Sequence, residues 1–212
     1  MKILITGFDP FGGETVNPAY EAVKLLPERI AGAEIVKLEI PTEFEKSMEI
    51  LEQAVRQELP DAVISVGQAG GRAEITPERI GINLADARIC DNAGSKPQEQ
   101  PLAADGPAAY FSTLPLKEIV KNVQDSGIPC RISNSAGTYV CNSVMYRTLR
   151  LAETSQLGFR AGFIHVPYAT EQTVTKPAGT PGMALADDCA GALRRGGSGC
   201  KIYGGRMIKK RG

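Results

Sequence analysis

Two residues in the sequence are suited to nucleophilic catalysis, a cysteine and a histidine. Cys141 lies in the stretch "SNSAGTYVCNSVMYRTLR", after a segment typical of a strand and at the start of one typical of a helix. The start of a helix stabilises a thiolate through its dipole and its unpaired backbone N–H groups. His165 is the single histidine and ends the apolar segment "GFIH". The pair predicts a thiol nucleophile with an imidazole base; the alternatives are an inert buried cysteine and a structural histidine.

A cysteine–histidine pair needs a third group that fixes the imidazole tautomer. The sequence spacing leaves four acidic candidates open, which are Asp9, Glu78, Asp86 and Asp91. Glu78 is notable because it follows the glycine-rich segment "VGQAGGR" closely.

The remaining cysteines do not share the setting of Cys141. Cys130 lies in or beside a predicted strand, Cys189 and Cys200 lie near the C-terminus, and Cys90, in a loop, is the only rival. Five cysteines without a CxxC pair, in a chain with no visible export signal, predict reduced thiols and a cytoplasmic protein.

The composition excludes several other classes of function. A single histidine rules out a zinc site built from several histidines. Lys+Arg and Asp+Glu both number 24, so the charge balance gives no sign of nucleic-acid or membrane binding.

Alternating apolar strands and amphipathic helices must position these side chains. Apolar runs predict strands at 2–6, 61–67 and 161–167, and alternation predicts another at 33–41. Helical spacing is found over 18–30 and over 42–59, with Thr42 as a plausible N-cap, and within 106–127 a loop precedes a helix. "CRISNS" (130–135) predicts a strand before the helix that contains Cys141, and "RIGINLADARI" (79–89) again alternates.

This order predicts an α/β fold, with βαβ units and a mostly parallel, twisted sheet covered by helices on both faces. In such folds, binding sites form at the carboxyl ends of the strands. Cys141 and His165 follow or end different strands, so the fold can bring them together.

The C-terminal segment is unusual. We expect one α/β/α catalytic domain over 1–178, and over 179–212 an atypical glycine-rich segment of the same domain. That segment is predicted to hold at most one short helix, at about 183–195, and then a loose basic tail.

The loop "GFDPFGGETVNP" suggests a second class of protein, a module that binds a nucleotide or phosphate at a helix start. It matches neither GxGxxG nor a P-loop, because no GK[ST] follows. Phe8 and Phe11 in this loop predict either core residues or an apolar slot for a small ligand.

Four segments together resemble a known family. They are "TGFDPFGGETVNP", "VGQAGGR…ITPERIGINLADARI…DN", "SAGTYVCN" and "GFIHVPY", and the resemblance runs from Met1 to about Val174. The family is pyroglutamyl-peptidase I, a group of cytosolic cysteine peptidases that remove N-terminal 5-oxoproline from peptides. The resemblance implies a single three-layer α/β/α domain, a homotetramer, and neither a metal nor an organic cofactor.

The motif match also implies roles for individual residues. Glu78, Cys141 and His165 would form the catalytic triad, and Arg88 would support the oxyanion together with the Cys141 backbone N–H. The residues expected to bind the substrate ring are Phe8, Phe11, Asn17, Gln68 and Tyr139.

This sequence departs from the family pattern at three places. Cys90 stands where the family usually has proline, Tyr139 replaces the commoner phenylalanine and adds a hydroxyl that needs a partner, and the tail after about Gly179 differs from the family's closing helix. An inactive relative that binds peptides without cleaving them is the third alternative, although all three triad residue types are present.

Overall fold

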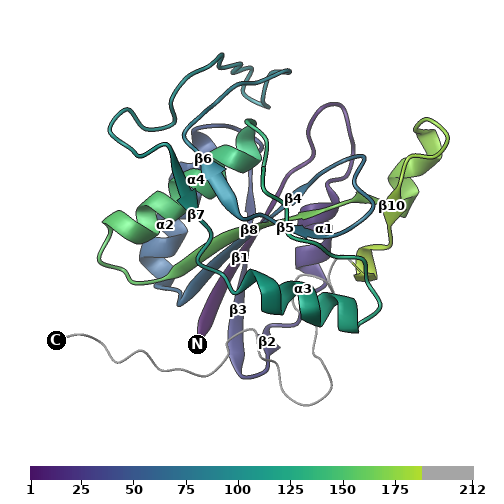
Figure 1. The fold of residues 1–212 in the computed structure, drawn as a ribbon, viewed down its shortest axis with the longest axis horizontal. Helices are drawn as coiled ribbons and strands as arrows, with labels where there is room; N and C mark the ends of the chain where they lie inside the picture. The colour runs from purple at the N-terminus through teal and green to yellow at the C-terminus, as the bar shows by residue number, and fades with distance from the viewer. Residues whose placement is uncertain (188–212) are drawn as a thin grey trace.

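The computed structural model describes residues 1–187 of the 212-residue chain. A six-stranded sheet lies at its centre (Figure 1). In spatial order its strands are β2 (Arg29–Ile30), β3 (Ala33–Ile40), β1 (Lys2–Phe8), β4 (Ala62–Gln68), β8 (Arg160–Val166) and β5 (Thr76–Pro77). β3, β1, β4 and β8 run parallel, whereas β2 and β5 lie antiparallel at the two edges. The predicted α/β fold with a mostly parallel sheet is confirmed.

The central strands are largely apolar because protein covers both faces of the sheet. In β1, Ile3, Leu4 and Ile5 are each at most 1% exposed, and Val63 and Ile64 of β4 are equally buried. Strand-forming runs that lack polar alternation therefore mark the middle of this fold.

Helices cover both faces of the sheet. α1 (Pro18–Lys24) and α3 (Leu116–Asp125) pack into one hydrophobic cluster, and α2 (Lys46–Glu58) and α4 (Val140–Thr154) pack into the other. Figure 1 shows the two pairs on opposite sides of the strands. The result is a three-layer α/β/α arrangement.

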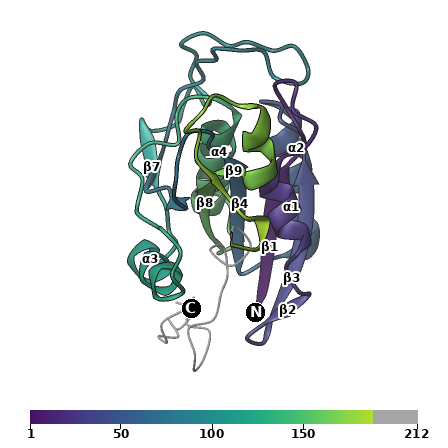
Figure 2. The ribbon, with the colours of Figure 1, turned by 90° about the vertical axis from the view of Figure 1, so that its right-hand side faces the viewer.

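Small elements complete the described chain. A two-stranded sheet pairs β6 (Ile80–Ile82) with β7 (Ala109–Phe111), and another pairs β9 (Tyr168–Ala169) with β10 (Gly182–Met183), with a 3₁₀ helix η1 (Thr170–Thr175) between the last two. Figure 2 shows the loop after β1 and the long segment between β6 and β7 at the end of the sheet opposite the N-terminus. That end is where the parallel strands have their carboxyl ends.

Four predicted elements were wrong in extent or type. The segment 130–135 is not a strand: it makes only the isolated bridges Ile75↔Cys130 and Glu78↔Ser133. The helix predicted over 42–59 begins at Lys46, because Thr42 is turned toward Asp9: its backbone N–H donates to Asp9 Oδ1 and its hydroxyl to the Asp9 carbonyl.

The first helix and the alternating segment are also shorter than predicted. The helix expected over 18–30 ends at Lys24, and the chain returns as β2. Of the alternating segment 79–89, only Ile80–Ile82 forms a strand, and the chain then continues as a loop. Within the segment 179–212, Gly182–Met183 form β10 and residues 185–187 are helical, whereas residues 188–212, with most of the predicted helix and the basic tail, lie outside the described residues.

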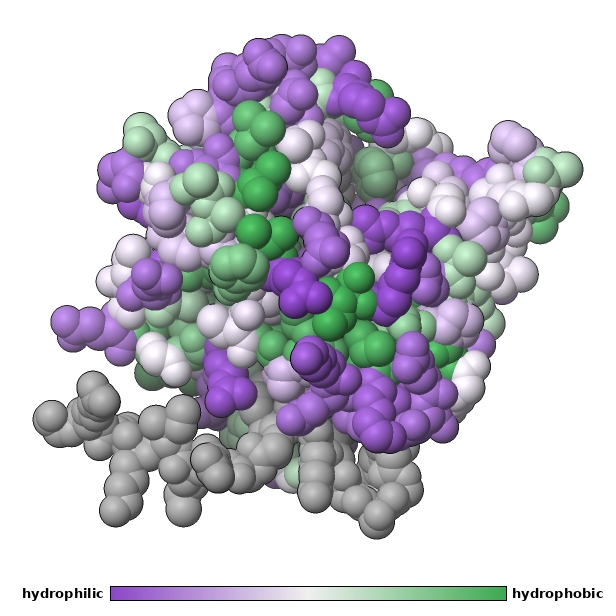
Figure 3. Space-filling model, in the orientation of Figure 1, coloured by the Kyte–Doolittle hydropathy of each residue, from purple (hydrophilic) through white to green (hydrophobic). Residues whose placement is uncertain are grey.

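On the face seen in Figure 3, hydrophilic residues occupy much of the outline, and hydrophobic ones gather in patches toward the middle. Within residues 1–187, none of the helices has the length and apolar character needed to cross a bilayer.

Candidate active site

Glu78 and His165 meet at the carboxyl end of β8. β5 pairs antiparallel with β8, Thr76 lies opposite His165, and the Glu78 backbone N–H donates to the Phe163 carbonyl at 2.8 Å. His165 Nδ1 lies 2.8 Å from Glu78 Oε1. A carboxylate only accepts hydrogen bonds, so Nδ1 carries the proton and Nε2 is left as the acceptor. Strand pairing thus fixes both the distance and the tautomer.

Arg72 binds the same carboxylate oxygen as His165 does. Its Nη1 donates to Glu78 Oε1 at 2.6 Å and to Thr76 Oγ1 at 2.5 Å, and its Nη2 donates to the Ser135 carbonyl at 3.2 Å. Burial acts to raise the pKa of Glu78, but hydrogen bonds from His165, Ser133 and Arg72 outweigh it and lower the pKa. Glu78 is therefore a fully buried carboxylate that stays charged.

Cys141 is brought to this pair by α4. It is the second residue of the helix, which begins after Tyr139, and confirms the predicted place at a helix start. Its Sγ lies 3.0 Å from the point where a Cβ on Gly67 would stand, and Gly67 lies opposite His165 in the β4–β8 register. The thiol, the imidazole and the carboxylate thus share one end of the sheet, although they come from three separate elements.

The ionisation of Cys141 differs from the expectation. Burial, followed by the charge of Glu78, raises the pKa of the thiol to about 12, against smaller lowering effects of Arg72 and a backbone hydrogen bond. Burial also lowers the pKa of His165, even though the Glu78 carboxylate acts to raise it. The ligand-free site therefore holds a neutral thiol and a neutral imidazole, because burial disfavours the charged form of each group.

The other acidic candidates are engaged elsewhere. Asp9 Oδ1 accepts from the backbone of Thr42 and from Asn92, whereas the Asp91 carboxylate accepts three backbone N–H groups. Asp86 pairs through its backbone with Thr138. Of the four candidates, only Glu78 reaches the imidazole.

The predicted ring-binding aromatic residues fall into two groups. Phe8 is 2% exposed and packs on Phe163 at a centroid distance of 6.1 Å, as a core residue would. Phe11 and Tyr139 are half-buried, with their rings 6.3 Å apart, and Phe44 meets Tyr139 edge-on at 5.5 Å. Tyr139, the residue before α4, therefore places an aromatic ring two positions before Cys141.

The hydroxyl of Tyr139 has the partner that the sequence analysis required. It donates to the Cys90 carbonyl at 3.0 Å, which ties the start of α4 to the loop that contains Cys90. Burial raises the pKa of this phenol to about 12, and the nearby acidic groups of Asp91, Cys141 and Cys90 act in the same direction. The ring is thus held as a neutral phenol.

The polar residues predicted for substrate binding, Asn17 and Gln68, and for oxyanion support, Arg88, have different surroundings. Asn17 caps α1: its Oδ1 accepts from the Ala19 N–H at 3.1 Å, and its Nδ2 donates to the Asp9 carbonyl at 2.8 Å. Gln68 ends β4, and its Oε1 accepts from Gln172 at 3.1 Å. Arg88 is exposed and makes no hydrogen bond or ion pair within the described part of the chain.

The free thiols other than Cys141 are set apart from the site chemistry. Cys90 is exposed in its loop. Cys130 is 3% exposed, and burial raises its pKa to about 12. Cys189 and Cys200 lie outside the described residues.

The sequence analysis missed two residues at this end of the sheet, Arg72 and Gln172. Arg72 closes the quoted motif "VGQAGGR", and a lone cation at the end of a glycine-rich turn was the available signal. Gln172 lies in a short polar segment without periodicity, so the sequence offers no comparable signal for it.

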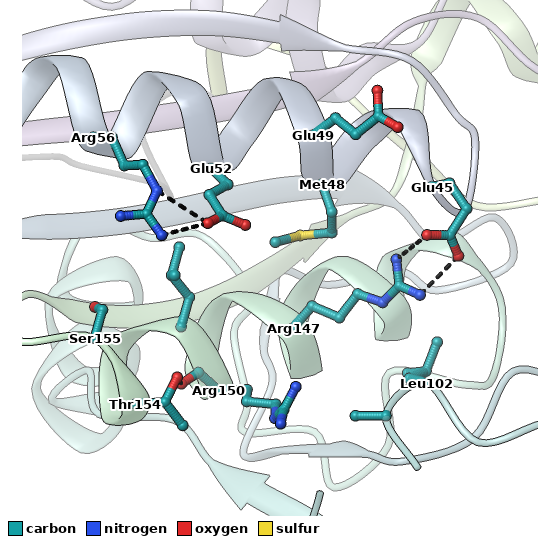
Figure 4. A pocket seen from close by; sticks show the side chains of 12 residues that line it. Glu45, Met48, Glu49, Glu52, Arg56, Leu102, Arg147, Arg150, Thr154 and Ser155 are labelled. Carbon is teal, nitrogen blue, oxygen red and sulfur yellow. Dashed lines mark hydrogen bonds and ion pairs between the residues drawn. The ribbon is translucent and has the colours of Figure 1, made fainter. Parts of the chain in front are cut away.

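A separate groove between α2 and α4 has a volume of about 540 Å³ (Figure 4). Its charged side chains satisfy one another: Arg147 binds Glu45 through two hydrogen bonds, and Arg56 does the same with Glu52. The groove offers little uncompensated charge to a ligand and contains none of the predicted site residues. Over residues 1–187 there is also no cluster of three or more His, Cys, Asp or Glu suited to a metal ion.

A thiol, an imidazole with a fixed tautomer and a buried carboxylate at the carboxyl end of an α/β sheet are the elements of a thiol-dependent hydrolase. Comparisons with known proteins agree. A family model described as "Pyroglutamyl peptidase" matches residues 1–195. The pyrrolidone-carboxylate peptidase of Clostridium perfringens strain 13 is 56% identical over 191 residues, which cover 90% of this chain and 89% of the relative.

Other relatives give the same result. The pyrrolidone-carboxylate peptidase of Lactobacillus johnsonii is 54% identical, over 88% of this chain and 86% of its own. The crystal structure of pyroglutamyl peptidase I from Bacillus amyloliquefaciens is similar with a TM-score of 0.87 at 46% identity, over 90% of both chains. Pyrrolidone carboxyl peptidase from Pyrococcus furiosus also has a TM-score of 0.87, at 43% identity, over 91% of this chain and 94% of its own.

The chain belongs to the pyroglutamyl peptidase family. The expected family is thereby confirmed, and with it the class of enzyme, a hydrolase of peptide bonds.

Proposed function

We propose that the protein removes an N-terminal pyroglutamyl residue from peptides, with Cys141 as the nucleophile, His165 as the general acid and base, and Glu78 as the residue that orients the imidazole. The observation that carries this is the contact of His165 Nδ1 with the buried Glu78 carboxylate at 2.8 Å, because it leaves Nε2 free to take a proton. The family membership supplies the reaction class.

The ionisation of the site suggests how the first step occurs. Thiol and imidazole are both neutral before substrate binds, so the Cys141 proton passes to His165 Nε2 as the sulfur attacks the scissile carbonyl. The tetrahedral oxyanion accepts a hydrogen bond from the Cys141 backbone N–H at the start of α4, and Arg88 is its second partner. The imidazolium is stabilised by the Glu78 carboxylate while it lasts.

The second half of the reaction restores the site. The imidazolium gives its proton to the leaving amine as the C–N bond breaks, which leaves a pyroglutamyl thioester on Cys141. Water then attacks the thioester while His165 takes one of its protons. That proton returns to the sulfur as the C–S bond breaks, and pyroglutamate leaves with the thiol regenerated.

The substrate ring would lie against the aromatic side chains. Pyroglutamate is a flat, neutral lactam, and Phe11 and Tyr139 are half-buried rings near the nucleophile. Phe8 would form the floor beneath them, and Asn17 would hold the loop through its cap. A prolyl ring carries a charged amine, whose burial without a partner is costly.

The test is chromophore release from a pyroglutamyl amide and from the matching prolyl amide, by the wild type and by Cys141→Ser. We expect cleavage of the pyroglutamyl substrate only, and its loss in the variant with little change in melting temperature. A folded, reduced wild type that cleaves neither substrate would refute the proposal and favour an inactive relative or a phosphate-binding module.

Three further expectations remain predictions. The homotetramer is supported by the family resemblance, and sedimentation equilibrium would test it. The cytoplasmic location rests on the sequence, and fractionation of cells would test it. The division into a catalytic domain (1–178) and a C-terminal segment (179–212) would be tested by limited proteolysis; β10, at Gly182–Met183, already pairs with β9.

A further inference from the structure

Gln172 on η1 joins three parts of the chain beside the site. Its Oε1 accepts from the Ala169 backbone N–H at 2.9 Å. Its Nε2 lies within hydrogen-bond distance of Gln68 Oε1 at 3.1 Å, the Val16 carbonyl at 3.2 Å and Glu14 Oε2 at 3.3 Å. One amide therefore connects the end of β4, the loop after β1 that contains Phe11, and η1.

These contacts determine which way round each amide lies. A backbone N–H only donates, and a backbone carbonyl and a carboxylate only accept, so the orientation of the Gln172 amide is fixed at both ends. The atom of Gln68 that faces Gln172 Nε2 must then be its oxygen. The Gln68 Nε2 group consequently points away from Gln172, and it donates to no residue in the described part of the chain.

Gln68 lies close in the chain and in the sheet to the residues that contact Cys141 and His165. Gln68 directly follows Gly67, beside which Cys141 Sγ lies, and it is the register partner of Val166, the residue after His165. Through Gln172, which contacts both, the Gln68 amide is tied to the loop that contains Phe11. A ring held against Phe11 would therefore have this donor at its edge.

We propose that Gln172 is a positioning residue for substrate specificity, which presents the Gln68 Nε2 donor to the lactam carbonyl of the substrate ring. This rests on the proposed function and deepens it. The Ala169 N–H fixes the orientation of the Gln172 amide, and Gln172 in turn fixes that of the Gln68 amide. The site therefore favours a ring that has a hydrogen-bond acceptor at the edge facing Gln68 Nε2. A prolyl ring has no carbonyl there and leaves the donor unpaired.

An ion pair keeps Glu14 charged, and therefore able to accept a hydrogen bond from Gln172. Lys176 binds Glu14 Oε1 at 2.6 Å, and its side chain lies 4.4 Å from the centre of the Tyr168 ring. Charge pairing keeps the pKa of Glu14 below its ordinary value, with the Lys176 hydrogen bond as the largest cause. The carboxylate therefore remains an acceptor for Gln172.

The competing explanation is that Gln172 serves only as a helix cap. Its Oε1 bond to the Ala169 N–H is the side-chain half of a capping box on η1. Gln172→Glu separates the two roles, because a carboxylate still accepts from Ala169 but has no hydrogen to donate to Gln68. In this variant the Gln68 amide is expected to turn over and present its oxygen to the ring.

The variant is best measured in a Glu14→Gln background, because a carboxylate at position 172 would otherwise face Glu14. Relative to Glu14→Gln alone, Gln172→Glu should raise KM for the pyroglutamyl amide by roughly 10- to 100-fold, the usual worth of a lost hydrogen bond with an unpaired partner. kcat should change less, since the ring contact is present before the reaction begins. Glu171→Gln, on the exposed side of η1, is the matched control and should behave as wild type.

A double-mutant cycle tests whether Gln172 acts through Gln68. Gln68→Met removes the donor itself, so it should raise KM by a similar factor, and adding Gln172→Glu to it should have little further effect. If the two substitutions raise KM independently, so that their factors multiply in the double variant, the proposal is overturned. It is also overturned if Gln172→Glu changes KM by less than twofold relative to Glu14→Gln alone. If Gln172→Glu does not fold, an unchanged KM in Gln68→Met overturns it instead.

A binding experiment separates failure of this inference from failure of the proposed function. The probe is 2-pyrrolidone, the bare lactam, with pyrrolidine as the comparison, and the readout is the shift in melting temperature of the full chain. Wild type should be stabilised by the lactam alone, and Gln172→Glu in its background should lose that preference. An inactive wild type would refute the proposed function. If the wild type is active but the Gln172→Glu protein still prefers the lactam, the inference about Gln172 is refuted while the proposed function stands.

Discussion

Replacing Gly67 by alanine adds one methyl group at the point where β4, β8 and α4 meet. The new Cβ would lie 2.7 Å from Phe163 Cζ, 2.9 Å from Phe163 Cε1 and 3.0 Å from Cys141 Sγ. Unstrained contacts between carbon atoms are about 3.5–4.0 Å, so the neighbours must withdraw by roughly 1 Å. The backbone itself is not the obstacle, because Gly67 lies in a regular strand with a conformation open to alanine.

The structure indicates which neighbour moves. Phe163 is fully buried and confined between Phe8, at 6.1 Å between ring centroids, and His165, at 4.8 Å. Cys141 is only partly buried, so the sulfur has more freedom. Overpacking of this kind costs about 1–3 kcal/mol of stability. A nucleophile displaced by about 1 Å loses on the order of 100-fold in rate.

The assay combines kcat/KM for a pyroglutamyl amide, urea unfolding and the rate of alkylation of Cys141. We expect a fall of about 100-fold in kcat/KM with a modest loss of stability. Ser65→Ala, on the same face of β4, is the control: its hydroxyl is buried without a hydrogen-bond partner, so its removal should leave activity unchanged. Phe163→Leu added to Gly67→Ala should recover stability more than activity. Wild-type kcat/KM in a fully stable Gly67→Ala protein would refute the packing argument.

Three further outcomes are expected. Glu78→Gln should lower kcat by about 10³- to 10⁴-fold, and the acidic limb of the residual pH–rate profile should move to lower pH, because the carboxylate that raises the pKa of His165 is gone; an unmoved limb contradicts this. Arg72→Met should raise the pKa of Glu78. The ionised Glu78 should then contribute less to the unfolding free energy at pH values above its unfolded pKa. Urea titrations from pH 7 to pH 3 should therefore show a smaller loss of unfolding free energy in the variant than in the wild type. Burial raises the pKa of Cys130 in the folded chain to about 12, against 9.0 ordinarily, so between these pH values only the unfolded chain loses the thiol proton. The unfolding free energy should therefore fall by up to ~1.4 kcal/mol per pH unit in this range, and by less in Cys130→Ala. The same dependence of the unfolding free energy on pH in both proteins would argue against a buried thiol.

The sequence predicts the framework of this fold well because its strands are buried on both faces. The runs that contain Ile3–Ile5, Val63–Ile64 and Phe163–Ile164 have no polar alternation, which is typical of the centre of a parallel sheet. The position of Cys141 at a helix start was equally readable, since small and polar residues precede a long amphipathic run.

Long-range hydrogen bonds explain what sequence patterns did not predict. Thr42 has the residue type of an N-cap, but its hydroxyl and N–H bind Asp9, which is 33 positions away. The segment 130–135 has strand-like composition, yet its partners allow only isolated bridges. The choice of Glu78 among four acidic residues depends on the antiparallel pairing of a two-residue strand, which no local pattern encodes.

Ionisation was the other limit of sequence reasoning. A helix start suggested a thiolate at Cys141, but the amount of protein around the sulfur determines whether that charge is tolerated. Gln172 illustrates the same point for orientation, because its role follows from four contacts made by a side chain in a segment without periodicity.

The burial of the only imidazole in the chain has a spectroscopic consequence. His165 is 4% exposed, its Nδ1–H is held by Glu78 at 2.8 Å, and the Phe163 ring lies 4.8 Å away. A proton so shielded from water should exchange slowly and appear as a single downfield resonance, with the ring carbons shifted by the neighbouring aromatic current. Since the sequence has one histidine, that signal needs no assignment. Proton magnetic resonance of the unlabelled protein would therefore follow the charge state of the site directly, through titration, alkylation and the arrival of a substrate analogue.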